Sequence, residues 1–146
     1  MDAHELARDW VSVFNTGDAS RAGTVVSETF VEHATAPFGR GTPGRVNGPA
    51  HLAEASGWLR VQFPDLRMEI EAIVAERDLV AVLVATTGTN DGPLNGMMPA
   101  THRAFSARQS HWFRVEDGRF AEHWATRDDL STMLQLGVVV MPGQPR

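Results

Sequence analysis

The sequence predicts a single α+β domain in which helices cover one face of a curved, mostly antiparallel sheet. Apolar residues recur at helical spacing through the first part of the chain, the period changes to two from Leu66 onward, and a short helical segment follows the last strand. With 146 residues, 42% of them hydrophobic and 21% charged, the chain is long enough to bury a core as one domain over residues 1–146.

The first half of the chain contains three predicted helices and one extended segment. Residues 2–16 form an amphipathic helix, with Asp2 as its N-cap and Glu5 at the third helical position. A short helix is expected over residues 19–27 and an extended segment over residues 29–34. Another helix begins at Asn47-Gly48-Pro49 and stops at Pro64-Asp65, after a loop over residues 36–49 with four Gly and three Pro.

The second half is predicted to be a meander of strands closed by a small helix. Residues 66–74 and 79–87 form a hairpin, and residues 102–115 add the next strand. Asp117-Gly118 is a hairpin turn signal, after which the strand resumes and a short helix ends at Gly137. The glycine-rich loop over residues 87–101 carries Met97, whose soft apolar side chain is suited to covering a site.

Composition and charge favour small-molecule chemistry. The net charge is −5 and there is no Lys/Arg cluster, which argues against a nucleic-acid partner. The sequence has no Cys, and therefore no disulfide or thiolate chemistry. Because we find neither a secretory signal nor an apolar run of roughly 20 residues, we expect a cytoplasmic protein with no membrane association.

The side chains with catalytic potential gather on the last two strands. Period-two alternation places Gln109 and His111 on one face of their strand, and it places His123 on the opposite face from Trp124. Asp128 follows at the junction between strand and helix. A carboxylate at such a junction, close to His and Trp, is a candidate acid/base site.

Short motifs in this order resemble the SnoaL-like polyketide cyclases, a family within the nuclear-transport-factor-two-like superfamily. The motifs are Trp10-x-x-x-Phe14-Asn15-x-Gly17-Asp18, Glu32-His33, Phe63-Pro64-Asp65, Asp78-Leu79-Val80, Thr87-Gly88-Thr89, Phe113-Arg114-Val115-x-Asp117-Gly118, Glu122-His123-Trp124-x-x-x-Asp128 and Gln135-Leu136-Gly137. The chain departs from the family pattern at Asn90, where His is frequent, and around Pro99, so the resemblance does not identify the substrate.

The resemblance implies a cone-shaped, barrel-like fold with an apolar pocket, no metal or organic cofactor, and a homodimer or tetramer associating through the sheet. It also implies an intramolecular aldol condensation that closes a ring on a polyketide ester, with Asp128 as the general acid/base and His111 assisting at the second carbonyl. The residues expected to contact an apolar substrate are Trp10, Phe14, His33, Phe63, Met97 and Trp124.

Each of these assignments has a structural alternative. Asp128 has the residue type of an N-cap for the final helix, and His111 and His33 have that of core histidines bonded to backbone. His123 is interpreted as a sheet-packing or oligomer residue. A metal site built from His33, His102, His111 and Asp128 is the weaker interpretation, because the sequence has no short two-His motif.

Two other classes of function stay open on the same scaffold. One is a different enzyme, such as an isomerase, hydroxylase or epoxide hydrolase. The other is a non-catalytic module that binds a small apolar ligand, in which Asp128 would bond only to backbone amides of its own helix.

Overall fold

The structure, a computed structural model, describes residues 2–35, 45–46 and 48–144. The helices are α1 (Ala3–Thr16), α2 (Ala22–Val25), α3 (Gly48–Gln62) and α4 (Asp129–Gln135). The strands are β1 (Val26–Glu32), β2 (Arg45–Val46), β3 (Arg67–Glu76), β4 (Leu79–Thr89), β5 (Ala104–Glu116) and β6 (Arg119–Arg127). Most of the loop expected over residues 36–49 lies outside the described residues.

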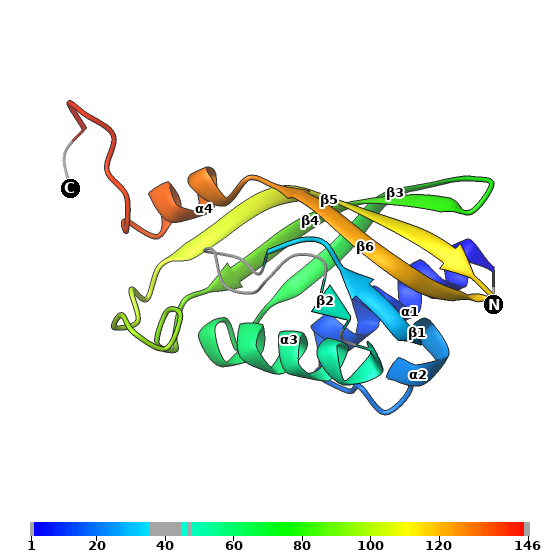
Figure 1. Ribbon diagram of the computed structural model, residues 1–146. Coiled ribbons are helices and arrows are strands. Elements are labelled where there is room, and N and C mark those ends of the chain that lie inside the picture. Colours follow the sequence, from blue (N-terminus) through cyan, green and yellow to red (C-terminus); the bar gives the residue numbers. More distant parts are fainter. Residues whose placement is uncertain (1, 36–44, 47, 145–146) are drawn as a thin grey trace.

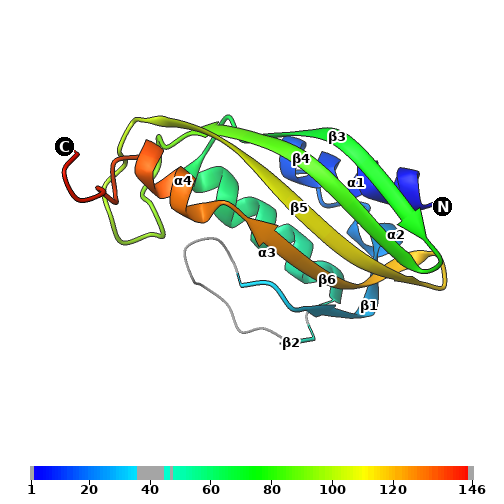
Figure 2. The same cartoon turned by 90° about the horizontal axis from the view of Figure 1, so that it is seen from above.

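The strands form one open, mixed sheet with α1, α2 and α3 packed on one face (Figures 1 and 2). The strand order is β2-β1-β6-β5-β4-β3, in which β1 runs parallel to β6 and every other pair is antiparallel. The predicted α+β class is confirmed. None of the described helices has the length and apolarity needed to cross a membrane.

The N-terminal helix begins as its sequence predicts. The side chain of Asp2 accepts from the backbone N–H of Glu5, and the Glu5 side chain accepts from the N–H of Asp2, which completes a capping box. The second helix is shorter than expected, because residues from Val26 onward pair with β6 and form β1 instead. Strand pairing therefore overrides the local preference for helix.

Two β-bulges interrupt the antiparallel pairing of the sheet. One lies between Ile70 and Ala72, so Glu71 has no partner on β4. The other leaves Ala121 without a partner, because Val115 pairs with Phe120 while the next pair along joins residues 114 and 122. A bulge bends its strand and shifts all later pairs by one residue. Both Phe120 and Ala121 are consequently buried, which simple alternation does not predict.

The loop between β4 and β5 is anchored to the end of α3. Asn90 is fully buried; its amide donates to the carbonyls of Gln62 and Gly92, and its side-chain oxygen accepts from the N–H of Thr101. The Gln62 side chain in turn accepts from the N–H of Asn95. This loop and α4 lie at the same end of the sheet (Figures 1 and 2).

Candidate acid/base site

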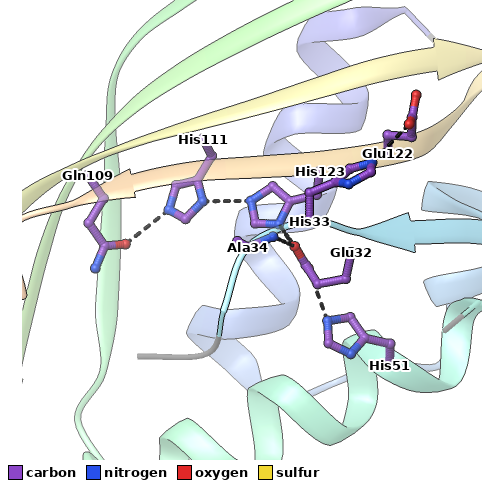
Figure 3. A network of polar contacts seen from close by, with 8 residues as sticks. All are labelled: Glu32, His33, Ala34, His51, Gln109, His111, Glu122 and His123. Atoms are coloured by element: carbon purple, nitrogen blue, oxygen red, sulfur yellow. Dashed lines mark hydrogen bonds and ion pairs between the residues drawn. The ribbon is translucent and has the colours of Figure 1, made fainter. Parts of the chain in front are cut away.

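A continuous line of hydrogen bonds joins four side chains beneath the sheet, and we call these residues the polar network: Glu32, His123, His111 and Gln109 (Figure 3). Glu32 Oε1 lies 2.7 Å from His123 Nδ1, His123 Nε2 lies 2.9 Å from His111 Nδ1, and His111 Nε2 lies 3.0 Å from Gln109 Oε1. Each imidazole therefore uses both of its ring nitrogens inside the network.

The strand registers explain why these residues meet. Glu32 pairs with His123 across the parallel β1 and β6 strands. On the next strand, His111 pairs with Ala125, two residues beyond His123, so the two imidazoles project from the same face of the sheet. This is the face that the helices cover.

Aromatic rings enclose the two imidazoles. The indole of Trp10, on α1, lies with its centroid 4.7 Å from that of His111 and 5.5 Å from that of His123. Phe113 stacks on His123 at 4.9 Å. His111 and His123 are only 4% and 6% exposed, so their charges are shielded from bulk water.

The carboxylate at the inner end of the network is held in its ionised form. Burial raises the pKa of Glu32, but hydrogen bonds from His123, His51 and the N–H of Ala34 outweigh burial and lower that pKa to about 2. At neutral pH Glu32 is therefore a buried negative charge that only accepts hydrogen bonds.

The histidine in the middle of the network is held neutral. Burial lowers the pKa of His111 well below its ordinary value, the nearby His123 and Arg127 lower it further, and the negative charge of Glu32 opposes them only in part. A neutral imidazole donates from one ring nitrogen and accepts at the other. His111 can therefore carry its proton on either ring nitrogen while the ring stays neutral.

The outer end of the network reaches less buried surroundings. Gln109 is half-buried, and it pairs across the strands with Arg127. The Arg127 side chain is 11% exposed and its Nε lies 3.2 Å from Asp129 Oδ1. Asp128 sits between these two residues. The network therefore ends at the same end of the sheet as the β6 to α4 junction.

Asp128 is an exposed N-cap in this structure. Its Oδ1 accepts from the N–H of Ser131 at 3.1 Å, the hydrogen bond that starts α4. The N-cap role expected from residue type is confirmed. The desolvated environment that a carboxylate base near neutrality needs is not found at this side chain.

Two of the expected substrate contacts lie on the other face of the sheet. Trp124 is 37% exposed and pairs with Trp112, while the ring of His33 stacks on Trp124 at 4.8 Å. His33 also bonds to Glu122 at 2.9 Å. Because His123 and Trp124 are successive residues of a strand, they point in opposite directions, and the structure does not bring Trp124 or His33 to His111.

The other expected contacts are divided between the core and the surface. Trp10 and Phe14 are buried against each other at 4.7 Å, and Trp10 alone of this pair has a ring contact with the polar network. Phe63 is buried against Phe105, a core contact. Met97 is 81% exposed at the loop tip.

The four residues considered as a metal site are not brought together. His33 lies on the outer face, and His102 is exposed and bonds to Asp91. Within residues 2–35, 45–46 and 48–144 there is no cluster of three or more acidic or His side chains arranged to hold a metal ion.

Sequence reasoning missed three members of the polar network. It singled out His33 in the Glu32-His33 pair, assigned His123 to packing or assembly, and gave Gln109 no role. The signal that was present is the spacing of His111 and His123 across the Asp117-Gly118 turn, which allows both imidazoles to share a face once the Ala121 bulge is included.

The amino-acid sequence is similar to that of one family of known proteins. The family model described as SnoaL-like polyketide cyclase matches residues 4–136. Nogalonic acid methyl ester cyclase of Streptomyces nogalater is 33% identical over 128 residues, covering 87% of this chain and 91% of that protein. Aklanonic acid methyl ester cyclase DnrD of Streptomyces peucetius is 33% identical over 135 residues, covering 91% and 89%.

Solved structures show the same architecture. IdmH of Streptomyces antibioticus superimposes with a TM-score of 0.79 at 27% identity, covering 94% of this chain and 99% of that one. TsrD of Streptomyces laurentii gives a TM-score of 0.78 at 25% identity, covering 95% and 99%.

Proposed function

The chain belongs to the SnoaL-like polyketide cyclase family, and we propose that it closes a ring on an aromatic polyketide methyl ester by intramolecular aldol condensation. The observation that carries this proposal is the buried polar network, which runs from an ionised carboxylate to a half-buried amide beside the β6 to α4 junction. The two ester cyclases suggest the substrate class, a fused-ring methyl ester with carbonyl groups on either side of an acidic methylene.

The proposed reaction needs one base and one stabilised oxygen. The base removes a proton from the methylene carbon, and the resulting carbanion attacks a second carbonyl carbon of the same molecule. A carbon–carbon bond forms, the carbonyl π bond breaks, and its oxygen becomes an alkoxide that takes up the proton. Nothing is oxidised and no group leaves, so general acid/base catalysis is sufficient.

We propose Asp128 as this base, acting beside the outer end of the polar network. Its position next to Arg127, whose strand partner is Gln109, supports the proposal. Asp128 is an exposed carboxylate, so proton abstraction relies on the acidity of the flanked methylene. Both ring nitrogens of His111 are already hydrogen-bonded within the polar network. His111 therefore assists the reaction indirectly, through these hydrogen bonds, and does not contact the substrate itself.

The experiment is turnover of aklanonic acid methyl ester by Asp128→Asn. Asn also caps helices, so we expect a stable variant whose kcat falls by about 10²–10⁴-fold, the range typical of a lost general acid/base. Asp2→Asn makes the same change at the N-cap of α1 and should keep wild-type turnover. Wild-type turnover by Asp128→Asn would show that the base lies elsewhere.

One observation favours a second candidate, a module that binds the ester without converting it. The one hydrogen bond of the Asp128 side chain, among the described residues, is to a backbone amide of its own helix. Saturable binding of the ester by wild-type protein, with no ring closure and no effect of Asp128→Asn on the affinity, would favour this candidate.

We also propose that two copies associate through the outer face of the sheet. Strand pairing aligns Val74, Ala81, Trp112 and Trp124 in one row across β3, β4, β5 and β6. Val74, Trp112 and Trp124 are 64%, 45% and 37% exposed. A contiguous apolar row of this kind is typical of a protein interface.

A further inference from the structure

The amide group of Gln109 ends the polar network at a half-buried position. Gln109 uses its Oε1 to contact His111 Nε2 at 3.0 Å. Its Nε2 has no hydrogen-bond partner among the residues that the structure describes. This nitrogen is not one of the fully buried side-chain atoms that lack a partner. A free amide donor at the half-buried end of an otherwise satisfied network is a feature to be explained.

Hydrogen-bond direction determines what this amide can offer. Glu32 is ionised and can only accept, so His123 donates to it from Nδ1. The Gln109 oxygen can also only accept, so His111 donates to it from Nε2. Because His111 is neutral, its Nδ1 must then accept, and the donor to that nitrogen is His123 Nε2.

This pattern assigns both ring protons to His123. An imidazolium at that position lies 2.7 Å from the Glu32 carboxylate, which supplies the opposite charge that a buried cation requires. The other charged or titratable groups around the pair are His51 from α3, which bonds to Glu32, and Arg127 on β6. Trp10 covers both rings from α1.

Loss of one proton reverses the network. A neutral His123 that still donates to Glu32 has an accepting Nε2, so His111 must donate from Nδ1 and accept at Nε2. Gln109 must then turn its NH₂ group toward His111 and its oxygen outward. The proton on His123 therefore decides whether Gln109 presents a donor or an acceptor beyond the network.

We propose that Gln109 is a catalytic residue whose NH₂ group donates to the substrate oxygen that becomes negatively charged, and that Glu32, His123 and His111 position this amide. This inference rests on the proposed ring closure, in which one carbonyl oxygen becomes an alkoxide. An amide fixed in advance toward that oxygen acts as an oxyanion donor, which is stronger in a partly buried site than in water.

The first experiment measures turnover of aklanonic acid methyl ester by two Gln109 variants. Gln109→Leu removes the donor, and Gln109→Glu keeps the oxygen facing His111 while replacing the NH₂ group with an acceptor. We expect kcat to fall about 10²–10³-fold in both, with a smaller change in KM. Gln144→Leu, at an exposed site, is the matched control and should behave as wild type.

A double variant separates a positioning role from a merely structural one. Glu32→Gln removes the charge that supports the imidazolium, and combined with Gln109→Leu it should add little to the loss from either change alone.

A second measurement needs no turnover. In ¹⁵N NMR spectra of histidine-labelled wild type, the hydrogen-bond directions of the network predict His123 with a proton on both nitrogens and His111 with a proton on Nε2 alone. A His111 protonated on Nδ1 would overturn the positioning part of the inference. Turnover by Gln109→Leu equal to wild type would overturn the catalytic part and leave the ring closure standing, whereas a wild type that binds but never cyclises the ester removes the proposed function itself.

Discussion

His111 Nδ1 and His123 Nε2 lie 2.9 Å apart, with their rings inclined by 16°. Two imidazoles so close cannot both carry a full positive charge inside the protein, because like charges in a shielded environment repel strongly. Their coupling therefore allows one charge at most, and Glu32 on the far side of His123 determines which ring holds it. Residues from three strands, β1, β5 and β6, thus form one electrostatically coupled unit.

The carboxylate of this unit should stabilise the fold in a pH-dependent way. The pKa of Glu32 is lowered from 4.5 in the unfolded chain to about 2 in the folded protein. The stabilisation that its charge contributes is therefore complete above pH 4.5 and is lost as the pH falls toward about 2. We expect Glu32→Gln to lower the free energy of unfolding at pH 7 by at most about 3 kcal/mol, the free energy that corresponds to this lowering of the pKa.

Urea unfolding at a series of pH values checks this prediction. The difference between wild type and Glu32→Gln should narrow steadily between pH 4.5 and pH 2. Glu69→Gln, at an exposed position of β3, should change little at any pH. A difference that stayed constant down to pH 2 would mean that the Glu32 side chain acts through packing, without its charge.

The loop after β4 should be sensitive to one methyl group. A Cβ on Gly92 would lie 1.8 Å from the carbonyl oxygen of Val61, so Gly92→Ala must push the loop away from α3 and weaken the bonds of Asn90 and Gln62. We expect a loss of about 2–4 kcal/mol in the free energy of unfolding, as for other changes that break buried polar contacts.

The same substitution in α3 provides the control. Gly57 has open space around its Cβ position and lies inside the helix, so Gly57→Ala should stabilise the protein by about 0.5–1 kcal/mol. Thermal unfolding should show a lower melting temperature for Gly92→Ala and a higher one for Gly57→Ala. This result would confirm that residue 92 must be glycine because the Val61 carbonyl lies so close, and not because the backbone there needs flexibility. Equal effects would contradict this explanation.

The sequence was sufficient for the class of fold and for most element boundaries. The capping box of Asp2 and Glu5 and the turn at Asp117-Gly118 are local signals, and both produce the expected structure. Strand β1 was only partly anticipated, because its first residues also suit a helix and its pairing with β6 is a long-range contact.

The expectation that Trp124 lies in one site with His111 failed at a single inserted residue. A regular hairpin closed at residues 116 and 119 would pair His111 directly with Trp124 and place both in one site. The bulge at Ala121 shifts the pairing so that His111 faces Ala125, and a shift of one residue moves every later side chain to the other face. Nothing in the composition of residues 119–127 indicates where such a bulge lies.

The outward turn of Trp124 makes the outer face of the sheet a testable interface. Trp112 and Trp124 are adjacent on neighbouring strands, and a charge at Trp112 would have to be buried if a second copy covers this row. We expect Trp112→Glu to convert a dimer to a monomer in sedimentation-velocity experiments, since an unpaired buried carboxylate is strongly unfavourable. Val61→Glu places the same charge on an equally apolar but separate site on α3, 64% exposed, and should leave the dimer intact. A wild-type protein that sediments as a monomer at micromolar concentration would contradict the proposed association, and dissociation by Val61→Glu alone would move the interface to the helical face.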